Sequence, residues 1–238
     1  MATTRLTRTQ TAGTRTKATL STWVKRGDLS EDTLYTQFAD GTNFTRFRFT
    51  SDTINANDRT SGSENWYFTT NAVYRDPAAW YHVVISIDTT QSTDTDRLRC
   101  WVNGVLQTFT SQSYPTEDAN MNMNQTGQTS QIGANELTAD YFDGVMAHTH
   151  WTDGYSYAAS DFGETDSTSG IWVAKTGPSV TYGTNGFFLK YQDTAAFGDD
   201  SSGETNDFTL SGTMTQTKDN PDNNFCTSTP IVGNADSA

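Results

Sequence analysis

Two alternating runs between Trp80 and Gly104 constrain the fold of this chain more than any other feature. The runs, residues 80–88 and 97–104, are rich in β-branched and aromatic residues, and the loop between them has no apolar residue from Thr89 to Asp96. Apolar side chains recur at every second position, as in strands that pack on one side. Asn103-Gly104 supplies the left-handed conformations of a tight turn. The pattern predicts two neighbouring antiparallel strands followed by a hairpin.

Similar runs recur along the chain between polar turns, and no helical period persists for two turns. Strands are expected over residues 18–25, 33–38, 44–50, 66–73, 131–133, 142–151, 187–191 and 208–211. A brief helix is expected over 156–162 and an extended segment over 172–178, whereas 1–17, 51–65 and 108–131 are expected to be irregular. This spacing predicts an all-β sandwich.

The same segments carry a resemblance to a known family. Trp80-Tyr81-His82-Val83-Val84, followed by Val102-Asn103-Gly104, resembles the central strands of laminin-G-like, concanavalin A-like jelly rolls. Residues 141–147, 151–154, 160–164, 171–175, 182–189 and 198–203, in order with 6–9 and 21–27, are similar to a variant found in large virion proteins of marine bacteriophages. The resemblance runs from near residue 5 to near residue 226. It implies a concanavalin A-like jelly-roll β-sandwich of two antiparallel sheets with little helix.

The resemblance also implies a domain division and a setting. Residues 1–17 would be an N-terminal arm, 18–215 the jelly-roll domain, and 216–238 a C-terminal extension or linker. The similar proteins are virion components, so the implied partners are other virion proteins and copies of this chain. The implied location is the virion surface, after synthesis in the host cytoplasm.

Charge and cysteine content narrow the partners further. The net charge of −13 is concentrated in residues 111–238, which hold 3 Lys and no Arg against 17 Asp/Glu. Nucleic acid needs clustered cations and is not an expected partner of this half. No apolar run approaches the roughly 18–20 residues of a membrane span, and the Thr/Arg-rich start lacks an apolar stretch, so we expect no secretory signal. Cys100 and Cys226 lack metal-ligand spacing, and Cys100 is expected to be a buried free thiol.

A glucanase is the catalytic alternative, because concanavalin A-like sandwiches include retaining glucanases. Such an enzyme places two carboxylates about 5–5.5 Å apart, which on a strand requires Glu-x-Asp-x-Glu or a bulged version of it. Only Glu164-Thr165-Asp166 begins this pattern, and Thr168 and Ser169 follow where the second Glu belongs. We therefore expect no catalytic residues.

Several aromatic and acidic side chains fall near expected strand ends or loops, where they could contact a ligand. Aromatic rings can stack on sugars and carboxylates or amides can accept hydroxyl hydrogen bonds, although most aromatics of a sandwich belong to its core. The candidates for carbohydrate binding are Trp66, Tyr67, Tyr74, Asn103, Asp143, Trp151, Asp153, Tyr155 and Tyr157.

Two metal hypotheses arise from the sequence. The segment 199–207 is dense in hard oxygen ligands, and the calcium candidates are Asp199, Asp200, Asn206 and Asp207; the alternative is a turn without an ion. His148 and His150 share a face of a regular strand and form a pair suited to a transition metal, but no third ligand is identifiable. The alternative is a pair of partly exposed strand histidines.

The sequence thus favours a non-enzymatic virion structural protein, acting as capsid decoration, head fibre or tail fibre. Its lectin-like domain would attach to host surface glycans. The alternatives are a soluble carbohydrate-binding lectin without an assembly role and a glycan hydrolase.

Overall fold

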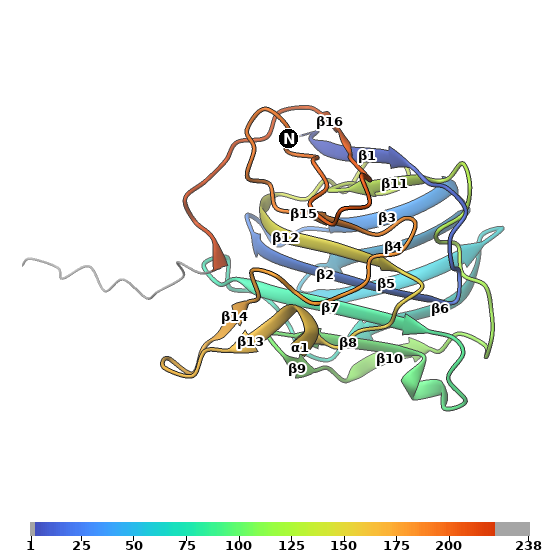
Figure 1. Ribbon diagram of the computed structural model, residues 1–238. Helices are drawn as coiled ribbons and strands as arrows, with labels where there is room; N and C mark the ends of the chain where they lie inside the picture. The colour runs from blue at the N-terminus through green and yellow to red at the C-terminus, as the bar shows by residue number, and fades with distance from the viewer. Residues whose placement is uncertain (1–2, 222–238) are drawn as a thin grey trace, which may run out of the picture.

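The computed structural model describes residues 3–221 and forms a sandwich of two antiparallel sheets (Figure 1). In spatial order, the eight-stranded sheet A contains β10 (Phe109–Ser113), β6 (Ser63–Thr70), β5 (Thr53–Thr60), β4 (Asn43–Thr50), β3 (Asp32–Asp40), β11 (Thr129–Ile132), β1 (Arg5–Thr9) and β16 (Thr209–Ser211). The six-stranded sheet B contains β15 (Phe187–Leu189), β12 (Gly144–Asp153), β2 (Lys17–Arg26), β7 (Tyr81–Asp88), β8 (Leu98–Val102) and β9 (Val105–Leu106). The predicted jelly-roll class is confirmed.

A small third sheet and one short helix lie outside the two layers. The third sheet pairs β13 (Gly163–Thr165) with β14 (Trp172–Ala174), and α1 (Ala159–Phe162) precedes it. A 3-10 turn, η1 (Asp94–Asp96), interrupts the loop between β7 and β8. The expected helix is therefore shorter than 156–162, and the Asp161 carboxylate caps it by accepting a hydrogen bond from the Ala158 N–H at 2.8 Å. No helix among the described residues has the length and apolarity needed to cross a membrane.

The predicted central hairpin is confirmed. β7 pairs with β8 along Val83–Ile87, and β8 turns into β9 through Asn103 and Gly104, whose φ angles are 47° and 80°. Both values lie in the left-handed region that a two-residue hairpin turn requires. Cys100 points inward from β8 and is a buried free thiol, as expected. Cys226 lies outside the described residues, as does most of the expected extension 216–238.

Aromatic side chains from both sheets fill the core between them. Tyr35 and Phe47 project from sheet A, and Trp151 and Phe187 from sheet B, and none of the four has exposed surface. The Tyr35 ring lies 5.1 Å from Trp151 and 5.7 Å from Phe187, and the Phe47 ring lies 5.9 Å from Trp151. These tilted contacts are favourable for aromatic quadrupoles, and each ring buries on the order of 150–250 Å².

Three segments expected to be irregular contain strands. The segment 51–65 holds β5 and the start of β6, and 108–131 holds β10 and most of β11. The segment 1–17 holds β1, which lies between β11 and β16 inside sheet A. In β5 the side chain of Asp58 faces inward, where it accepts hydrogen bonds from Thr45 Oγ1 at 2.5 Å and from the Asn122 N–H at 2.7 Å. Polar strand residues are thus stabilised by distant partners that local patterns do not reveal.

The β13–β14 hairpin covers a buried histidine on the outer face of sheet B. The His82 ring stacks between Trp23, at 4.6 Å, and Trp172 of β14, at 6.0 Å. Trp172 Nε1–H donates to His82 Nδ1 at 2.9 Å, and Ser21 Oγ lies 2.8 Å from His82 Nε2. Because the indole N–H can only donate, Nδ1 is the acceptor and Nε2 carries the proton. The network therefore holds a neutral imidazole.

This geometry predicts that acid destabilises the fold. Burial lowers the pKa of His82 from 6.5 to about 3, so between these values the unfolded chain binds more protons than the folded chain. The contribution of His82 to the free energy of unfolding is expected to fall by about 1.6 kcal/mol between pH 6.5 and 5, because the unfolded imidazole is already half protonated at pH 6.5. Urea unfolding of the wild type and of His82→Gln across this range measures the effect. An equally steep pH dependence in His82→Gln would contradict it.

Candidate functional site

A hollow in the described part of the chain lies beneath a segment that crosses one edge of the sandwich. We call residues 212–220 the strap and the hollow beneath it the strap pocket; its volume is about 600 Å³. Its lining consists of residues 4–6, 132–133, 142–148, 190–192, 197, 213–217, 219 and 220. A volume of this size lies within the range of about 300–1,000 Å³ typical of small-molecule sites.

The strap is fixed at both ends and near its middle. At one end Thr4 Oγ1 donates to the Thr213 carbonyl at 2.8 Å. At the other end the Asp219 carboxylate accepts hydrogen bonds from Lys25 Nζ at 2.7 Å and from Trp80 Nε1 at 3.0 Å, and these partners lower the pKa of Asp219, with Lys25 contributing most. Between the ends, Gln216 Nε2 donates to the Gln192 carbonyl at 3.1 Å. The pocket is therefore preformed, which reduces the entropy cost of binding.

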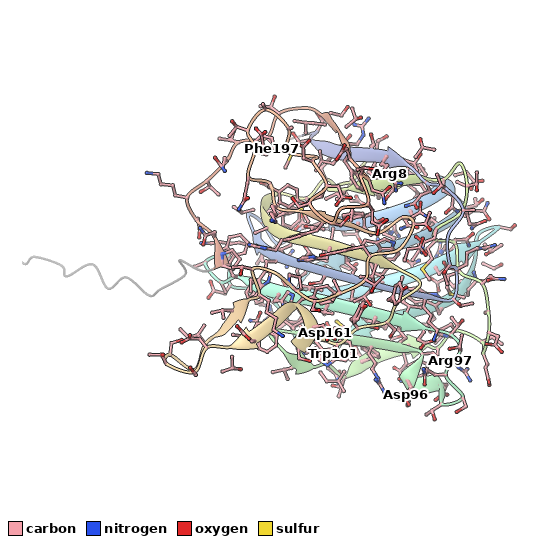
Figure 2. The ribbon with its side chains drawn as sticks, in the orientation of Figure 1. Arg8, Asp96, Arg97, Trp101, Asp161 and Phe197 are labelled. Carbon is pink, nitrogen blue, oxygen red and sulfur yellow. The ribbon has the colours of Figure 1, made fainter. Side chains whose placement is uncertain are left out.

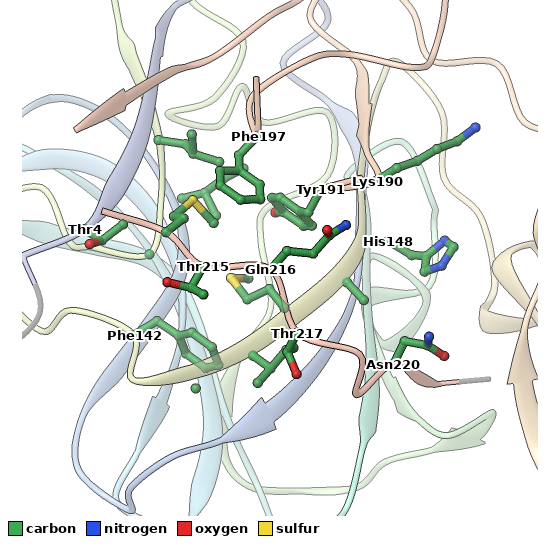
Figure 3. A pocket seen from close by; sticks show the side chains of 18 of the residues that line it. Thr4, Phe142, His148, Lys190, Tyr191, Phe197, Thr215, Gln216, Thr217 and Asn220 are labelled. Carbon is green, nitrogen blue, oxygen red and sulfur yellow. The ribbon is translucent and has the colours of Figure 1, made fainter. Parts of the chain in front are cut away.

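Aromatic rings and polar strap side chains share the pocket. Phe197 and Tyr191 lie on one side in Figure 3, Phe142 lies on the other, and the strap passes between them. Thr215 and Gln216 of the strap add a hydroxyl and an amide. Apolar ring surface beside neutral hydrogen-bonding groups is the combination that a sugar ring needs, since sugars present C–H faces and hydroxyl edges.

Two of the ten described non-glycine residues with positive φ line this pocket. His148 and Tyr191 both line it, and their φ angles of 47° and 56° lie in the left-handed region that non-glycine residues rarely adopt. His148 lies in a register break of β12 between Ala147 and His150. Tyr191 is held by its hydroxyl, which donates to Thr149 Oγ1 at 2.8 Å. Bulges and strained residues of this kind are over-represented at functional sites.

The nine predicted carbohydrate-binding residues do not come together. Trp66 and Trp151 have no exposed surface, so neither ring can stack on a ligand. Both rings belong to the core of the sandwich. Tyr74 and Asp153 are also buried, at 6% and 3% exposure. Asp143 alone lines the strap pocket.

The remaining four candidates lie on other parts of the surface. Tyr67 alternates with buried neighbours in β6 and faces outward from sheet A. Asn103 forms the β8–β9 turn, where its side-chain oxygen accepts the His82 N–H at 2.7 Å. Tyr155 and Tyr157 stack on each other at 6.1 Å in the loop before α1. None of the four lines the strap pocket.

Sequence reasoning missed Phe142, Tyr191, Phe197 and the strap residues as a site. Phe142 and Tyr191 stand at the first and last positions of two predicted strands, and this end position was the available signal. Gln216 and its neighbours fall in a polar segment with no periodicity, so local patterns do not distinguish them.

The acidic segment proposed for calcium forms a hydrogen-bonded turn. The Asp200 carboxylate accepts from the backbone N–H groups of Phe188 at 2.8 Å and Asn206 at 2.9 Å, and from both the N–H and the hydroxyl of Ser202. Asp207 accepts the Asp200 N–H at 2.8 Å, and Asp199 is exposed. These bonds occupy the carboxylate oxygens of Asp200, and calcium binding here stays a prediction.

The histidine pair does not share a regular strand face, because the register break separates its members. The expectation of two partly exposed rings is wrong for His150, whose side chain is 2% exposed. The His150 ring stacks on Phe188 at 3.9 Å, and its Nδ1 atom is hydrogen-bonded to the Tyr182 hydroxyl at 2.9 Å. Within residues 3–221, no group of three or more His, Cys, Asp or Glu side chains is arranged to hold a metal ion.

Comparison with known proteins identifies the family. The family model described as "Concanavalin A-like lectin/glucanases superfamily" matches residues 2–161. The chain belongs to this superfamily. The match to the concanavalin A-like lectin/glucanases model ends in α1, so the strap and the residues at 190–197 come from beyond the matched segment. No curated protein matches the chain.

Several solved structures are similar to this chain at low sequence identity. A heptameric SAP-like pentraxin from Limulus polyphemus is 15% identical with a TM-score of 0.45, covering 63% of this chain and 70% of that chain. The Ruminococcus gnavus IT-sialidase CBM40 is 15% identical with a TM-score of 0.46, covering 61% and 80%. Domains LG4-5 of the mouse laminin α1 chain are 6% identical with a TM-score of 0.45, covering 79% and 44%. Similarity at this level carries no ligand over to this chain.

Proposed function

We propose that this superfamily member is a non-enzymatic carbohydrate-binding module whose ligand occupies the strap pocket. The observation that carries the proposal is a preformed hollow of about 600 Å³ in which the half-buried rings of Phe142 and Tyr191 lie beside the hydroxyl and amide groups of the strap, and the buried ring of Phe197 completes the lining. Asp143, exposed at the rim, adds a carboxylate acceptor for a sugar hydroxyl.

The charges in the pocket favour binding over hydrolysis. A retaining glycosidase needs one carboxylate as nucleophile and a second with a raised pKa as acid. Asp143 and Asp219 are the carboxylates that line the pocket. Asp219 is fixed to Lys25 and Trp80, and its lowered pKa keeps it ionised, which is the opposite of what an acid catalyst needs.

The biological setting we propose is the surface of a virion, as capsid decoration, head fibre or tail fibre, with host surface glycans as ligands. The support is the ordered series of segments between residues 5 and 226 that is similar to marine bacteriophage virion proteins. Gold-labelled antibody on intact particles tests this setting. Regular labelling of the particle supports it, and unlabelled particles beside labelled soluble protein would favour a soluble lectin.

Binding in the strap pocket is expected to depend on Gln216. A glycan array first identifies a ligand, and calorimetry then compares the wild type with Gln216→Ala. The loss of one hydrogen bond, worth about 0.5–1.5 kcal/mol, is expected to weaken affinity roughly 2- to 12-fold. Tyr155→Ala, which truncates an exposed aromatic outside the pocket, is the matched control and is expected to bind normally. Normal binding by Gln216→Ala together with lost binding by Tyr155→Ala would place the site elsewhere.

A further inference from the structure

A second hollow of ligand size lies at the opposite edge of the sandwich. It lies between β8–β9 of sheet B and β10 of sheet A, has a volume of about 490 Å³, and is called here the edge groove. The charged, aromatic and amide side chains of its lining include Asp96, Arg99, Trp101, Phe109, Gln112 and Tyr114. Figure 2 shows Asp96 and Trp101 at one end of the molecule and Phe197 of the strap pocket at the other.

One arginine fixes the loops that form a wall of this groove. Arg97 donates through Nε to the Gln91 carbonyl at 2.7 Å, through Nη2 to the Ser92 carbonyl at 2.9 Å and through Nη1 to the Pro115 carbonyl at 3.1 Å. It therefore ties the loop that carries Asp96 to the segment that follows Tyr114. These hydrogen bonds preform this wall of the groove.

The chemistry of the lining selects an uncharged ligand. Trp101, Phe109 and Tyr114 are half-buried and offer ring surface, and Gln112 offers an exposed amide. The one cation in the lining, Arg99, is already paired with the one carboxylate, Asp96. A charged ligand would have to compete with this pair, whereas a neutral sugar needs only ring faces and amide groups.

The strand edges beside the groove argue against an added peptide strand. β9 is only two residues long, and the pairing of β10 with β6 is irregular between Phe109 and Ser111. Short and irregular edges are poor templates for backbone pairing. Exposed Val105 and Leu106 at 63% and 56% add apolar surface to this edge.

We propose that the edge groove is a second carbohydrate site, specific for neutral oligosaccharides, so that the domain is bivalent. The proposal uses the same sugar chemistry as the proposed function but different residues. Sheet A runs from β10 at the edge groove to β16 near the strap pocket. Eight strands at about 4.8 Å spacing place the two sites on the order of 30 Å apart, so they reach separate chains of a glycan-covered surface.

Calorimetric stoichiometry tests this proposal, with cellohexaose, laminarihexaose and maltohexaose as probes. The proteins are the wild type, Tyr114→Ala, Gln112→Ala and Gln216→Ala, each checked by thermal unfolding. Two sites are expected in the wild type. Tyr114→Ala is expected to weaken one of them at least about tenfold and Gln112→Ala about threefold, and Gln216→Ala is expected to affect only the other. Gln112 is exposed, so this variant tests the groove even if Tyr114→Ala unfolds.

Each other outcome is decisive. A single site that Gln216→Ala weakens and the groove variants leave intact overturns the second site and leaves the proposed function standing. A single site that only the groove variants weaken supports the edge groove and overturns the strap pocket as the glycan site. Binding of an extended peptide but of none of the three hexasaccharides at the groove would overturn the assignment of its ligand class.

Discussion

Arg26→Ala is expected to lower the free energy of unfolding by about 3–5 kcal/mol, the usual cost of leaving a buried charge without its partner. The side chains of Arg26 and Asp32 have no exposed surface and are joined at 3.3 Å. The guanidinium also donates to the Tyr74 carbonyl at 3.1 Å and lies 4.4 Å above the Phe49 ring. Truncation therefore removes a cation–π contact, several hydrogen bonds and the counter-charge of Asp32 together.

The experiment is chemical denaturation at pH 8, where Asp32 is ionised although burial raises its pKa to about 6. The matched comparison is the double variant Arg26→Met, Asp32→Asn. It removes both charges while keeping side chains of similar size, and it is expected to lose less stability than Arg26→Ala. A loss below about 1 kcal/mol in Arg26→Ala would show that this ion pair does not hold β2 to β3.

Asp153→Ala is expected to destabilise the fold by about 3–4 kcal/mol, because three buried donors and one partly buried donor would each lose a hydrogen bond to the carboxylate. The carboxylate accepts from the Thr14 N–H at 2.7 Å, from Asn124 Nδ2 at 3.1 Å, and from both the N–H and Nδ2 of Asn185 at 3.0 Å. These contacts join β12 to three distant loops. The sequence predicts Asp153 as a sugar-binding residue. Its burial and its hydrogen bonds instead indicate a structural role.

Asp143→Ala is the matched control for this prediction, since both aspartates were predicted as sugar ligands. Asp143 is exposed, and its truncation is expected to change the free energy of unfolding by less than about 0.5 kcal/mol. Thermal and urea unfolding of both variants measures the contrast. Equal stability of Asp153→Ala and the wild type would contradict the structural role of Asp153.

Alternation alone was sufficient to predict the strands around Trp80–Gly104, because each has a uniformly apolar inner face. It failed for β5, whose inward positions include Asp58 and whose outward positions are Asn55 and Asn57. The strand is stabilised by Asn122 and Thr45, which lie 64 and 13 positions away, and no local pattern contains that information.

The candidate site was less predictable than the fold for a related reason. Phe142, Tyr191 and Gln216 meet in the strap pocket only after both sheets have formed, so their proximity has no local signature. The break in β12 between Ala147 and His150 also defeats the alternation from which His148 and His150 were assigned a common face. Asp143, predicted from sequence as an acceptor for sugar hydroxyls, lines the strap pocket, and sugar binding by its carboxylate stays a prediction.

The position of β1 has a consequence for the growing chain on the ribosome. Arg5 pairs with Ser211, so 206 positions separate the first strand from its last neighbour. At about 5–20 residues per second, about 10–40 s of synthesis pass before both neighbours of β1 exist. The strand Arg5–Thr9 contains one apolar side chain, Leu6, among five. An unpaired strand of this polarity can remain solvated, with little tendency to aggregate, until β16 is synthesised and completes the sheet.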